Sequence, residues 1–377
     1  MSLRIAHYAY LKQREELNIV KVDVCIVGAG PGGALLAYLL ARKNVSVVLI
    51  ERTNQIGKTF RGEHLNEEGE AILKKYNLFD EVEKLGLLRM EKLEYWQDGK
   101  LYKTILPDSA VGHLGIHVPQ AHLLHVLLAA AEQYPTFQLM LSTKVEELLQ
   151  DEDGTYTGVS ASQNDEKVFI ESELVIGADG RNSTVRKKAN LDVTTRKHGY
   201  DLLWARIPAP EKWEPSIKMA LIGDKQISLF TQAKGYIQIG WNIEEGSFVA
   251  LRKQPFTPFI EQLIVAFPEL EQTVRENIIS WKDFVLLDVY SSTSENWGKK
   301  GVALIGDAVH TMTPTGAFGL NSALKDADYF ASLIDKNTIT QLNTADCASV
   351  RKKEVAKIQA IQVEKEQSFA SQFVVMV

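Results

Sequence analysis

The sequence contains very little cysteine. Its 377 residues include only Cys25 and Cys347, which lie far apart and have no metal-ligand spacing. A disulfide framework needs several pairs of cysteines, and a cysteine metal site needs closely spaced ones. The scarcity argues against a disulfide-stapled secreted domain and is typical of a reducing compartment, so we predict a cytoplasmic location.

Long apolar runs and an excess of positive charge are also missing. The longest apolar run, residues 34–41, is far shorter than the roughly 18 residues of a membrane span. The formal net charge is −6, which gives no basic surface for a phosphate backbone. The first residues contain no apolar segment of the kind found in secretory signals. We therefore predict no transmembrane segment and no nucleic-acid partner.

The length and the order of the predicted elements indicate about two domains. A strand–helix–strand pattern begins near Val22, a sheet-rich middle follows, and helical spacing returns after Gly319. Such an order predicts a nucleotide-binding α/β domain with an inserted sheet domain. The predicted boundaries are 1–20 for an N-terminal extension, 21–90, 115–195 and 285–340 for the nucleotide-binding domain, 91–114 and 196–284 for the substrate-binding sheet domain, and 341–377 for a C-terminal helical tail.

A glycine-rich turn follows the first predicted strand. In the pattern Gly28-x-Gly30-x-x-Gly33, the first glycine permits a tight turn, the second lets a pyrophosphate approach, and the third lets the helix pack on the strand. Glu51 ends the next strand, where an acid accepts hydrogen bonds from an adenosine ribose. Because NAD and FAD share this fingerprint, it predicts a dinucleotide without choosing between them.

Two later segments add to this fingerprint. In "ELVIGADGRNST" a strand runs into Asp179 and Gly180, and the acid either caps the following helix with Ser183 or contributes to a cofactor site. The stretch "GDAVHTMTPTGAFGLN" joins a short strand to an amphipathic helix through three glycines and one proline. It exposes backbone N–H groups at a helix start, which either only cap that helix or hold an anionic ligand.

Together, these three segments resemble those of the class A flavoprotein monooxygenases, the FAD-dependent aromatic hydroxylases of the para-hydroxybenzoate hydroxylase type. The resemblance implies a Rossmann-like FAD-binding domain with an inserted, mostly antiparallel β-sheet substrate domain. It places Asp307 at the ribityl chain and the loop after it against the flavin ring. The positions that the resemblance assigns to cofactor binding are Gly28, Gly30, Pro31, Gly32, Gly33, Glu51, Arg52, Arg61, Gln120, Val145, Asp179, Gly180, Gly306, Asp307, Pro314, Gly316, Gly319, Leu320 and Asn321.

The resemblance implies that FAD is reduced by NAD(P)H and reacts with O2 to a C4a-hydroperoxide, which hydroxylates an aromatic or other electron-rich small molecule. This chemistry belongs to the cofactor, so we name no catalytic side chain. Two alternatives stay open: a flavin-dependent reductase of the isoprenoid type, and a non-catalytic flavin-binding redox switch. The halogenase signature Trp-x-Trp-x-Ile-Pro is absent.

The inserted sheet supplies the candidate substrate residues. They are Trp204, Arg206, Met219, Phe230, Tyr236 and Trp241. Strand alternation alone also explains each of them as an inward-facing residue without a ligand, and Arg206 would suit a substrate carboxylate.

No metal site is predicted, since His113, His117, His122 and His125 lack ligand spacing. The tail after residue 341 is expected to pack on the FAD domain as a helix. Its final apolar residues would otherwise join a homodimer or touch a membrane surface.

Overall fold

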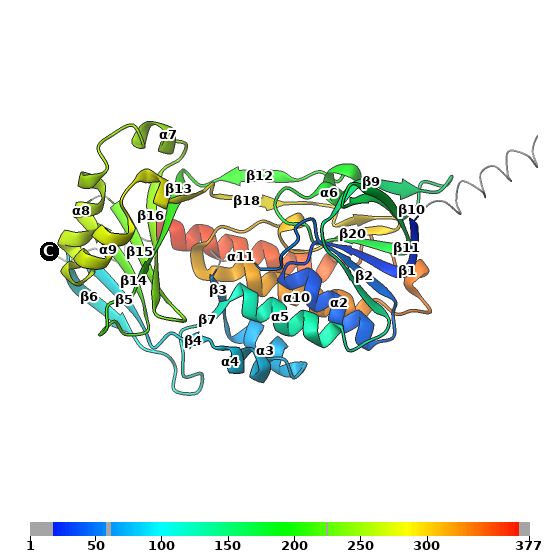
Figure 1. Ribbon diagram of the computed structural model, residues 1–377, viewed down its shortest axis with the longest axis horizontal. Coiled ribbons are helices and arrows are strands. Elements are labelled where there is room, and N and C mark those ends of the chain that lie inside the picture. The colour runs from blue at the N-terminus through cyan, green and yellow to red at the C-terminus, as the bar shows by residue number, and fades with distance from the viewer. Residues whose placement is uncertain (1–17, 58–61, 224, 369–377) are drawn as a thin grey trace, which may run out of the picture.

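The computed structural model describes residues 18–57, 62–223 and 225–368, which form two bodies along one long axis (Figure 1). The predicted extension up to residue 17, Arg61 and the last residues of the predicted tail lie outside the described residues. Within these ranges, no helix is long and apolar enough to cross a bilayer.

The first body is built on a mixed sheet with the strand order β19-β20-β11-β1-β2-β8. Strand β1 (Asn18–Val27) pairs in parallel with β2 (Val47–Ile50) and with β11 (Glu166–Gly177). β1 begins inside the predicted 1–20 extension, because β11 is long enough to pair with it from Asn18 onward. The other strands are β8 (Phe137–Met140), β9 (Thr143–Gln150), β10 (Tyr156–Gln163), β19 (Gly298–Lys299) and β20 (Val302–Leu304).

Helices cover this sheet. Helix α2 (Pro31–Arg42) packs on β1, β2 and β8, and it contacts both α5 (Gln120–Ala131) and α10 (Phe318–Leu333). Small residues allow this close packing, since a Cβ at Gly32 would lie 3.2 Å from the Cβ of Ala323 on α10. The shorter helices of the first body are α3 (Glu67–Lys75), α4 (Phe79–Leu85) and α6 (Thr184–Lys188).

The second body is a mostly antiparallel sheet with the order β17-β13-β16-β15-β14-β5-β6, as predicted for the inserted domain. Asp98 and Gly99 form the turn that joins β5 to β6, with φ values of 45° and 76°. Its strands are β5 (Lys92–Gln97), β6 (Lys100–Ile105), β13 (Tyr200–Pro208), β14 (Ser216–Ile222), β15 (Lys225–Gln232), β16 (Tyr236–Glu244) and β17 (Val285–Leu287). β17 pairs with β13, so this sheet continues past the predicted boundary at residue 284.

The two faces of the second sheet have different surroundings. Every second residue of its strands, such as Leu203, Ile227 and Ile239, is buried in a core with the covering helices. These helices are α7 (Phe248–Leu251), α8 (Thr257–Ala266) and α9 (Glu271–Asn277). The alternate residues face the first body.

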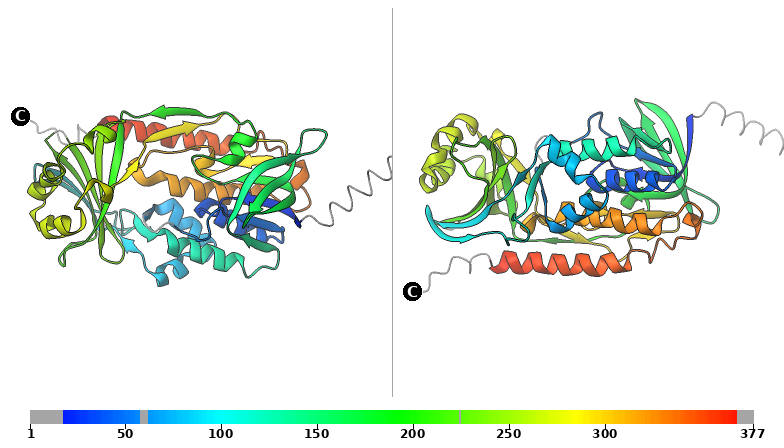
Figure 2. Two further views of the ribbon diagram at one scale, coloured as in Figure 1. Left: turned by 45° about the horizontal axis from the view of Figure 1, so that its top comes forward. Right: turned by 90° about the horizontal axis from the view of Figure 1, so that it is seen from below.

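Three connections join the bodies. Strands β12 (Thr194–Lys197) and β18 (Tyr290–Thr293) form an antiparallel ribbon between them (Figure 1). A small sheet contains β3 (Gly62–Leu65), β7 (Ile116–Pro119) and β4 (Leu88–Arg89). Helix α11 (Ser349–Ser368) runs along the first body toward the second sheet (Figure 2).

Candidate cofactor and substrate site

A cavity of about 1790 Å³ runs from the carboxyl ends of β1 and β2 to the inner face of the second sheet. Ligands of open α/β sheets bind at this end of the strands. The lining includes every predicted cofactor position among the described residues except Asn321.

The turn between β1 and α2 has almost no side-chain bulk. Gly28 has a φ of +107°, and a Cβ there would lie 2.5 Å from the carbonyl oxygen of Ala178. A Cβ at Gly33 would lie 2.1 Å from the carbonyl oxygen of Gly28, so packing within the protein itself requires both glycines. A Cβ at Gly30, in contrast, would meet no protein atom within 4 Å. Gly30 therefore leaves open space at the N-terminus of α2, which favours an anionic ligand.

The acid at the end of β2 lies beside this turn. One carboxylate oxygen of Glu51 accepts a hydrogen bond from the backbone N–H of Ala29 at 3.2 Å. The other accepts from the backbone N–H and the hydroxyl of Thr53 at 3.0 and 2.9 Å. These bonds fix the carboxylate at the cavity wall, which Arg52, Gln120 and Val145 also line.

Asp179 caps helix α6. Its carboxylate accepts hydrogen bonds from the Ser183 hydroxyl at 2.5 Å and from the backbone N–H groups of Thr184 and Val185 at 2.6 and 3.1 Å. Burial raises the pKa of Asp179, and these hydrogen bonds only partly counter that effect. The capping alternative is thus what the structure shows for this side chain, although Asp179 and Gly180 also line the cavity.

The loop from Gly306 to Leu320 forms the wall opposite the glycine turn. The carboxylate of Asp307 lies 3.5 Å from Arg181 Nε, and both residues line the cavity with Pro314, Gly316 and Gly319. Helix α10 begins directly after Ala317, which has a φ of 54° and provides no side-chain cap. The first N–H groups of α10 therefore lack a side-chain acceptor at the cavity wall.

Asn321 has a different position from the one predicted. It is only 2% exposed and lies outside the cavity lining. Its amide oxygen accepts from the backbone N–H of Asn66 at 3.1 Å, and its amide nitrogen donates to the carbonyl oxygen of His64 at 2.9 Å. Asn321 thus joins the start of α10 to the segment around β3.

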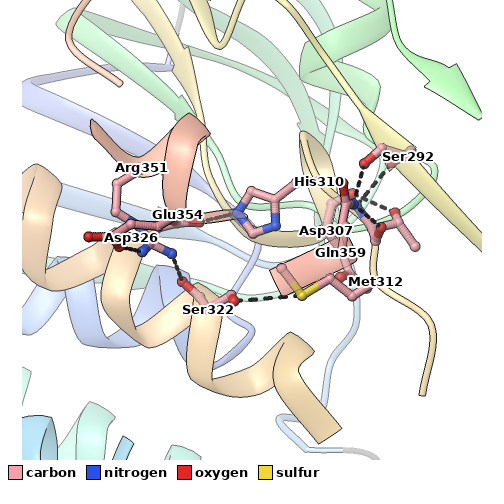
Figure 3. Close-up of polar contacts among 11 residues, drawn as sticks. Ser292, Asp307, His310, Met312, Ser322, Asp326, Arg351, Glu354 and Gln359 are labelled. Atoms are coloured by element: carbon pink, nitrogen blue, oxygen red, sulfur yellow. Dashed lines mark hydrogen bonds and ion pairs between the residues drawn. The ribbon is translucent and has the colours of Figure 1, made fainter. Parts of the chain in front are cut away.

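A buried charge network holds the loop at Gly306 and His310 (Figure 3). Asp326 of α10 accepts hydrogen bonds from the backbone N–H of Gly306 at 2.8 Å, from His310 Nε2 at 2.5 Å and from Arg351 Nε of α11 at 2.8 Å. Burial on its own would raise the pKa of Asp326, but His310 and Arg351 outweigh it and lower that pKa. No motif in the sequence pointed to Asp326 or Arg351. The sequence did offer one signal for Asp326, an acidic residue next to the apolar positions of the helix predicted after Gly319.

Helix α11 also reaches the cavity. The carboxylate of Glu366 accepts hydrogen bonds from the hydroxyls of Thr313, Thr315 and Tyr200 at 2.7, 2.8 and 3.0 Å. Its second oxygen lies 2.7 Å from His198 Nδ1. Glu366 therefore connects the loop before α10 to the start of the second sheet, a role for which the tail sequence carries no motif.

The inner face of the second sheet forms the far end of the cavity. Of the predicted substrate residues, Trp204, Met219 and Phe230 line it. Trp241 does not: it points to the opposite face and packs against Phe259 and Phe284, with ring centroids 5.4 and 5.3 Å away.

Arg206 and Tyr236 also lie outside the lining. Arg206 is exposed, and its guanidinium lies 4.7 Å from the centroid of the Tyr236 ring. Strand alternation removes Trp241 from the site, whereas Arg206 and Tyr236 lie too far along their strands to line it.

Comparison with known proteins identifies the family of this site. The family described as "FAD binding domain" matches residues 21–337, which is most of the chain. The chain belongs to the FAD-binding domain family. The resemblance inferred from the three motifs is therefore confirmed, and so are the fold and the cofactor FAD.

Individual relatives support the assignment. This FAD-binding domain protein is 31% identical over 312 residues to 6-methylpretetramide 4-monooxygenase from Streptomyces rimosus, a match that covers 81% of the chain and 73% of that relative. It is 25% identical over 315 residues to squalene epoxidase 6 from Arabidopsis thaliana and spans 60% of that longer protein. The structure of Pseudomonas aeruginosa PqsL in complex with 2-aminobenzoylacetate matches with a TM-score of 0.77 at 20% identity, covering 93% of this chain and 96% of PqsL.

These findings define the enzyme class. The protein is an FAD-dependent monooxygenase of the aromatic hydroxylase type, and NAD(P)H is the co-substrate typical of its family. The structure offers matching groups for FAD. The open space at Gly30, the anchored carboxylate of Glu51 and the uncapped start of α10 are suited to a phosphate, a ribose and an anionic ring, respectively.

Proposed function

We propose that FAD binds along the first body and that an aromatic substrate is hydroxylated at the far end of the cavity. In this arrangement the adenosine half lies by Gly28, Gly30 and Glu51, and the flavin half lies by Asp307 and the loop to Leu320. The observation that carries the proposal is the continuity of one cavity from the glycine turn to the aromatic side chains of the second sheet.

The protein's own residues have three tasks in this reaction. When bound, FAD supplies the redox chemistry, taking a hydride from NAD(P)H and transferring one oxygen atom of O2. The N–H groups at the start of α10 stabilise negative charge on the cofactor edge next to them. Trp204, Met219 and Phe230 form an apolar wall that orients the substrate ring and excludes water.

The partners of this proposed reaction are a small aromatic substrate, NAD(P)H and O2. Homodimer formation and a cytoplasmic location stay predictions. Size-exclusion chromatography with light scattering measures the oligomeric state directly.

The deciding experiment is a substrate screen on the purified, FAD-loaded protein. We expect phenolic compounds to accelerate NAD(P)H consumption and the product mass to increase by one oxygen atom. Reduction of an isoprenoid double bond without O2 would instead support the reductase alternative. Absence of any substrate-stimulated NAD(P)H oxidation would support the redox switch.

A further inference from the structure

The substrate end of the cavity is uncharged. Among the described residues of β3, β5, β7 and β13–β17, the lining carries amides, hydroxyls, aromatic rings and imidazoles but no acid, lysine or arginine. The polar groups of β15 and β16 there are Gln226, Ser228, Gln232, Gln238 and Asn242. The charged lining residues belong to the cofactor end, the β12 ribbon and α11.

Two histidines lie at this uncharged end. The rings of His64 on β3 and His117 on β7 have centroids 5.9 Å apart, and the His64 ring lies 5.7 Å from that of Phe230. The Nε2 atoms of both histidines are buried and have no hydrogen-bond partner within the described part of the chain. Buried polar atoms usually have partners, so these two atoms are candidates for contact with a ligand.

The proton on His117 has a defined position. His117 Nδ1 accepts a hydrogen bond from the backbone N–H of Ala233 at 3.0 Å. A neutral imidazole that accepts at Nδ1 carries its proton on Nε2. Burial, with repulsion from His64 and His122, lowers the pKa of His117 to about 3, so the ring is neutral at physiological pH. His117 therefore carries one N–H donor without a partner among the described residues, on a ring that lines the cavity.

We propose that His117 Nε2–H donates to a carbonyl or phenol oxygen of an uncharged aromatic substrate, and that His64 and Phe230 pack beside the same ring. This inference deepens the proposed function and rests on it. A substrate carboxylate would lose its hydration at this end without meeting a cation, which strongly disfavours its binding. The site therefore selects neutral oxygenated aromatics over benzoate-type acids.

The first test compares matched probes on the FAD-loaded protein. One pair is 3-hydroxyacetophenone and 3-hydroxybenzoate, and the other is 1-hydroxyanthraquinone and its 2-carboxylate. Binding of each compound is measured by calorimetry and by the change in flavin absorbance. We expect the ketone of at least one pair to bind at least about ten-fold more tightly than its acid. Tighter binding of the acids, as through exposed Arg196 on β12, would overturn the proposal. Failure of both ketones to bind would overturn it as well.

Two variants test the donor itself. His117→Asn keeps an acceptor for the Ala233 N–H but withdraws the donor from the cavity, whereas His117→Gln places an amide N–H near the former Nε2 position. We expect His117→Asn to bind the ketone about ten-fold more weakly with unchanged FAD content, and His117→Gln to recover most of the loss. Equal ketone affinity of wild type and His117→Asn would contradict the role of His117.

Imidazole NMR gives a readout without a ligand. In the 15N-histidine-labelled holoenzyme, His117 should appear as the neutral tautomer protonated on Nε2 at pH 7. A proton on Nδ1 or a charged ring at that pH would overturn the inference. Failure of the proposed function gives a different result: the ketones bind, but no compound of the screen stimulates NAD(P)H consumption.

Discussion

At the scale of single residues, the interior holds ionisable groups in two contrasting ways. Asp326 is fully buried and charged, because His310, Arg351 and a backbone N–H replace its lost hydration. His117 is also buried, but no acid faces its ring among the contacts of the described residues, and it stays neutral. The charged contacts of Asp326 hold the loop that begins at Gly306, whereas the neutral ring of His117 keeps an N–H donor for the proposed substrate.

The neutral state of His117 predicts a stability difference that depends on pH. Its folded pKa of about 3 lies below the ordinary value of 6.5, so the unfolded chain takes up a proton first as the pH falls. The contribution of His117 to the free energy of unfolding is fully present above pH 6.5 and is lost progressively toward pH 3. Between pH 6.5 and 5 the wild type should lose about 1.5 kcal/mol more than His117→Asn in urea unfolding. Parallel pH profiles of the two proteins would contradict this expectation.

The buried charge of Asp326 predicts a large mutational effect. Asp326→Asn removes the buried negative charge that Arg351 and His310 face, although Arg351 keeps its ion pair with Glu354, and should destabilise the protein by about 3 kcal/mol. Asp328→Asn on the same helix is the matched control. Its ion pair with Lys75 is more exposed to solvent, so the cost should stay within about 1 kcal/mol. Denaturant unfolding measures both, and equal losses would refute the special role of Asp326.

At the scale of elements, helix α11 is joined to the segments beside the cavity by a row of polar side chains. Gln359 donates to the carbonyl oxygens of Ser292 and Thr311 at 2.9 and 3.1 Å. Gln362 donates to those of Thr313 and Thr315 at 2.8 and 2.7 Å, and Glu366 accepts from the same two threonines. These side chains lie on one face, three and four residues apart. Tail packing is therefore based on amide and carboxylate contacts as well as apolar ones.

Removal of the last contact in this series should loosen the cofactor loop. Glu366→Ala leaves three hydroxyls and His198 without their acceptor, which should cost roughly 2 kcal/mol of stability and weaken FAD binding about ten-fold. Glu364→Ala, an exposed position on the same helix, should change neither quantity. Thermal unfolding and FAD titration provide the measurements. If both variants behave alike, α11 does not position the loop.

At the scale of the whole molecule, the cavity lies between two bodies that have separate cores. The ribbon of β12 and β18 and helix α11 hold these bodies together beside the cavity (Figure 2). In the proposed arrangement FAD contacts segments from much of the chain, including the β1 turn, β2 and the loop before α10. Cofactor binding should therefore stabilise the folded chain as a unit.

Gly30 allows this coupling to be tested without damage to the fold. At an FAD concentration one hundred times its Kd, the wild-type apoprotein should gain about 2.7 kcal/mol of stability. Gly30→Ala adds a methyl group where no protein atom lies within 4 Å, and its φ of −73° suits alanine, so the apoprotein should unfold as the wild type does. The methyl group occupies the space expected for the pyrophosphate, and the FAD-dependent gain should fall sharply. An unchanged gain would place the phosphates elsewhere.

Much of the cofactor end could be predicted from local sequence. The turn at Gly28 and Gly33, the acid at the end of β2 and the loop at Asp307 each depend on residues within a few positions of one another. The substrate end was predicted less well, as Trp241 and Arg206 show. Alternation predicts two faces for a strand, but it does not say which face meets the cavity or how far along the strand the cavity extends.

The sequence by itself determined the elements, the dinucleotide turn and the family, because each of these depends on short-range patterns of glycine, apolar and acidic residues. Only the tertiary structure decided that His64 and His117 meet Phe230, that Asp326 pairs with Arg351, and that Glu366 reaches the cavity. Asp326 and Arg351 lie 25 positions apart, and Glu366 and Tyr200 lie 166 apart. Contacts of this kind form because packing of the two cores brings distant segments together, and no local pattern records that packing.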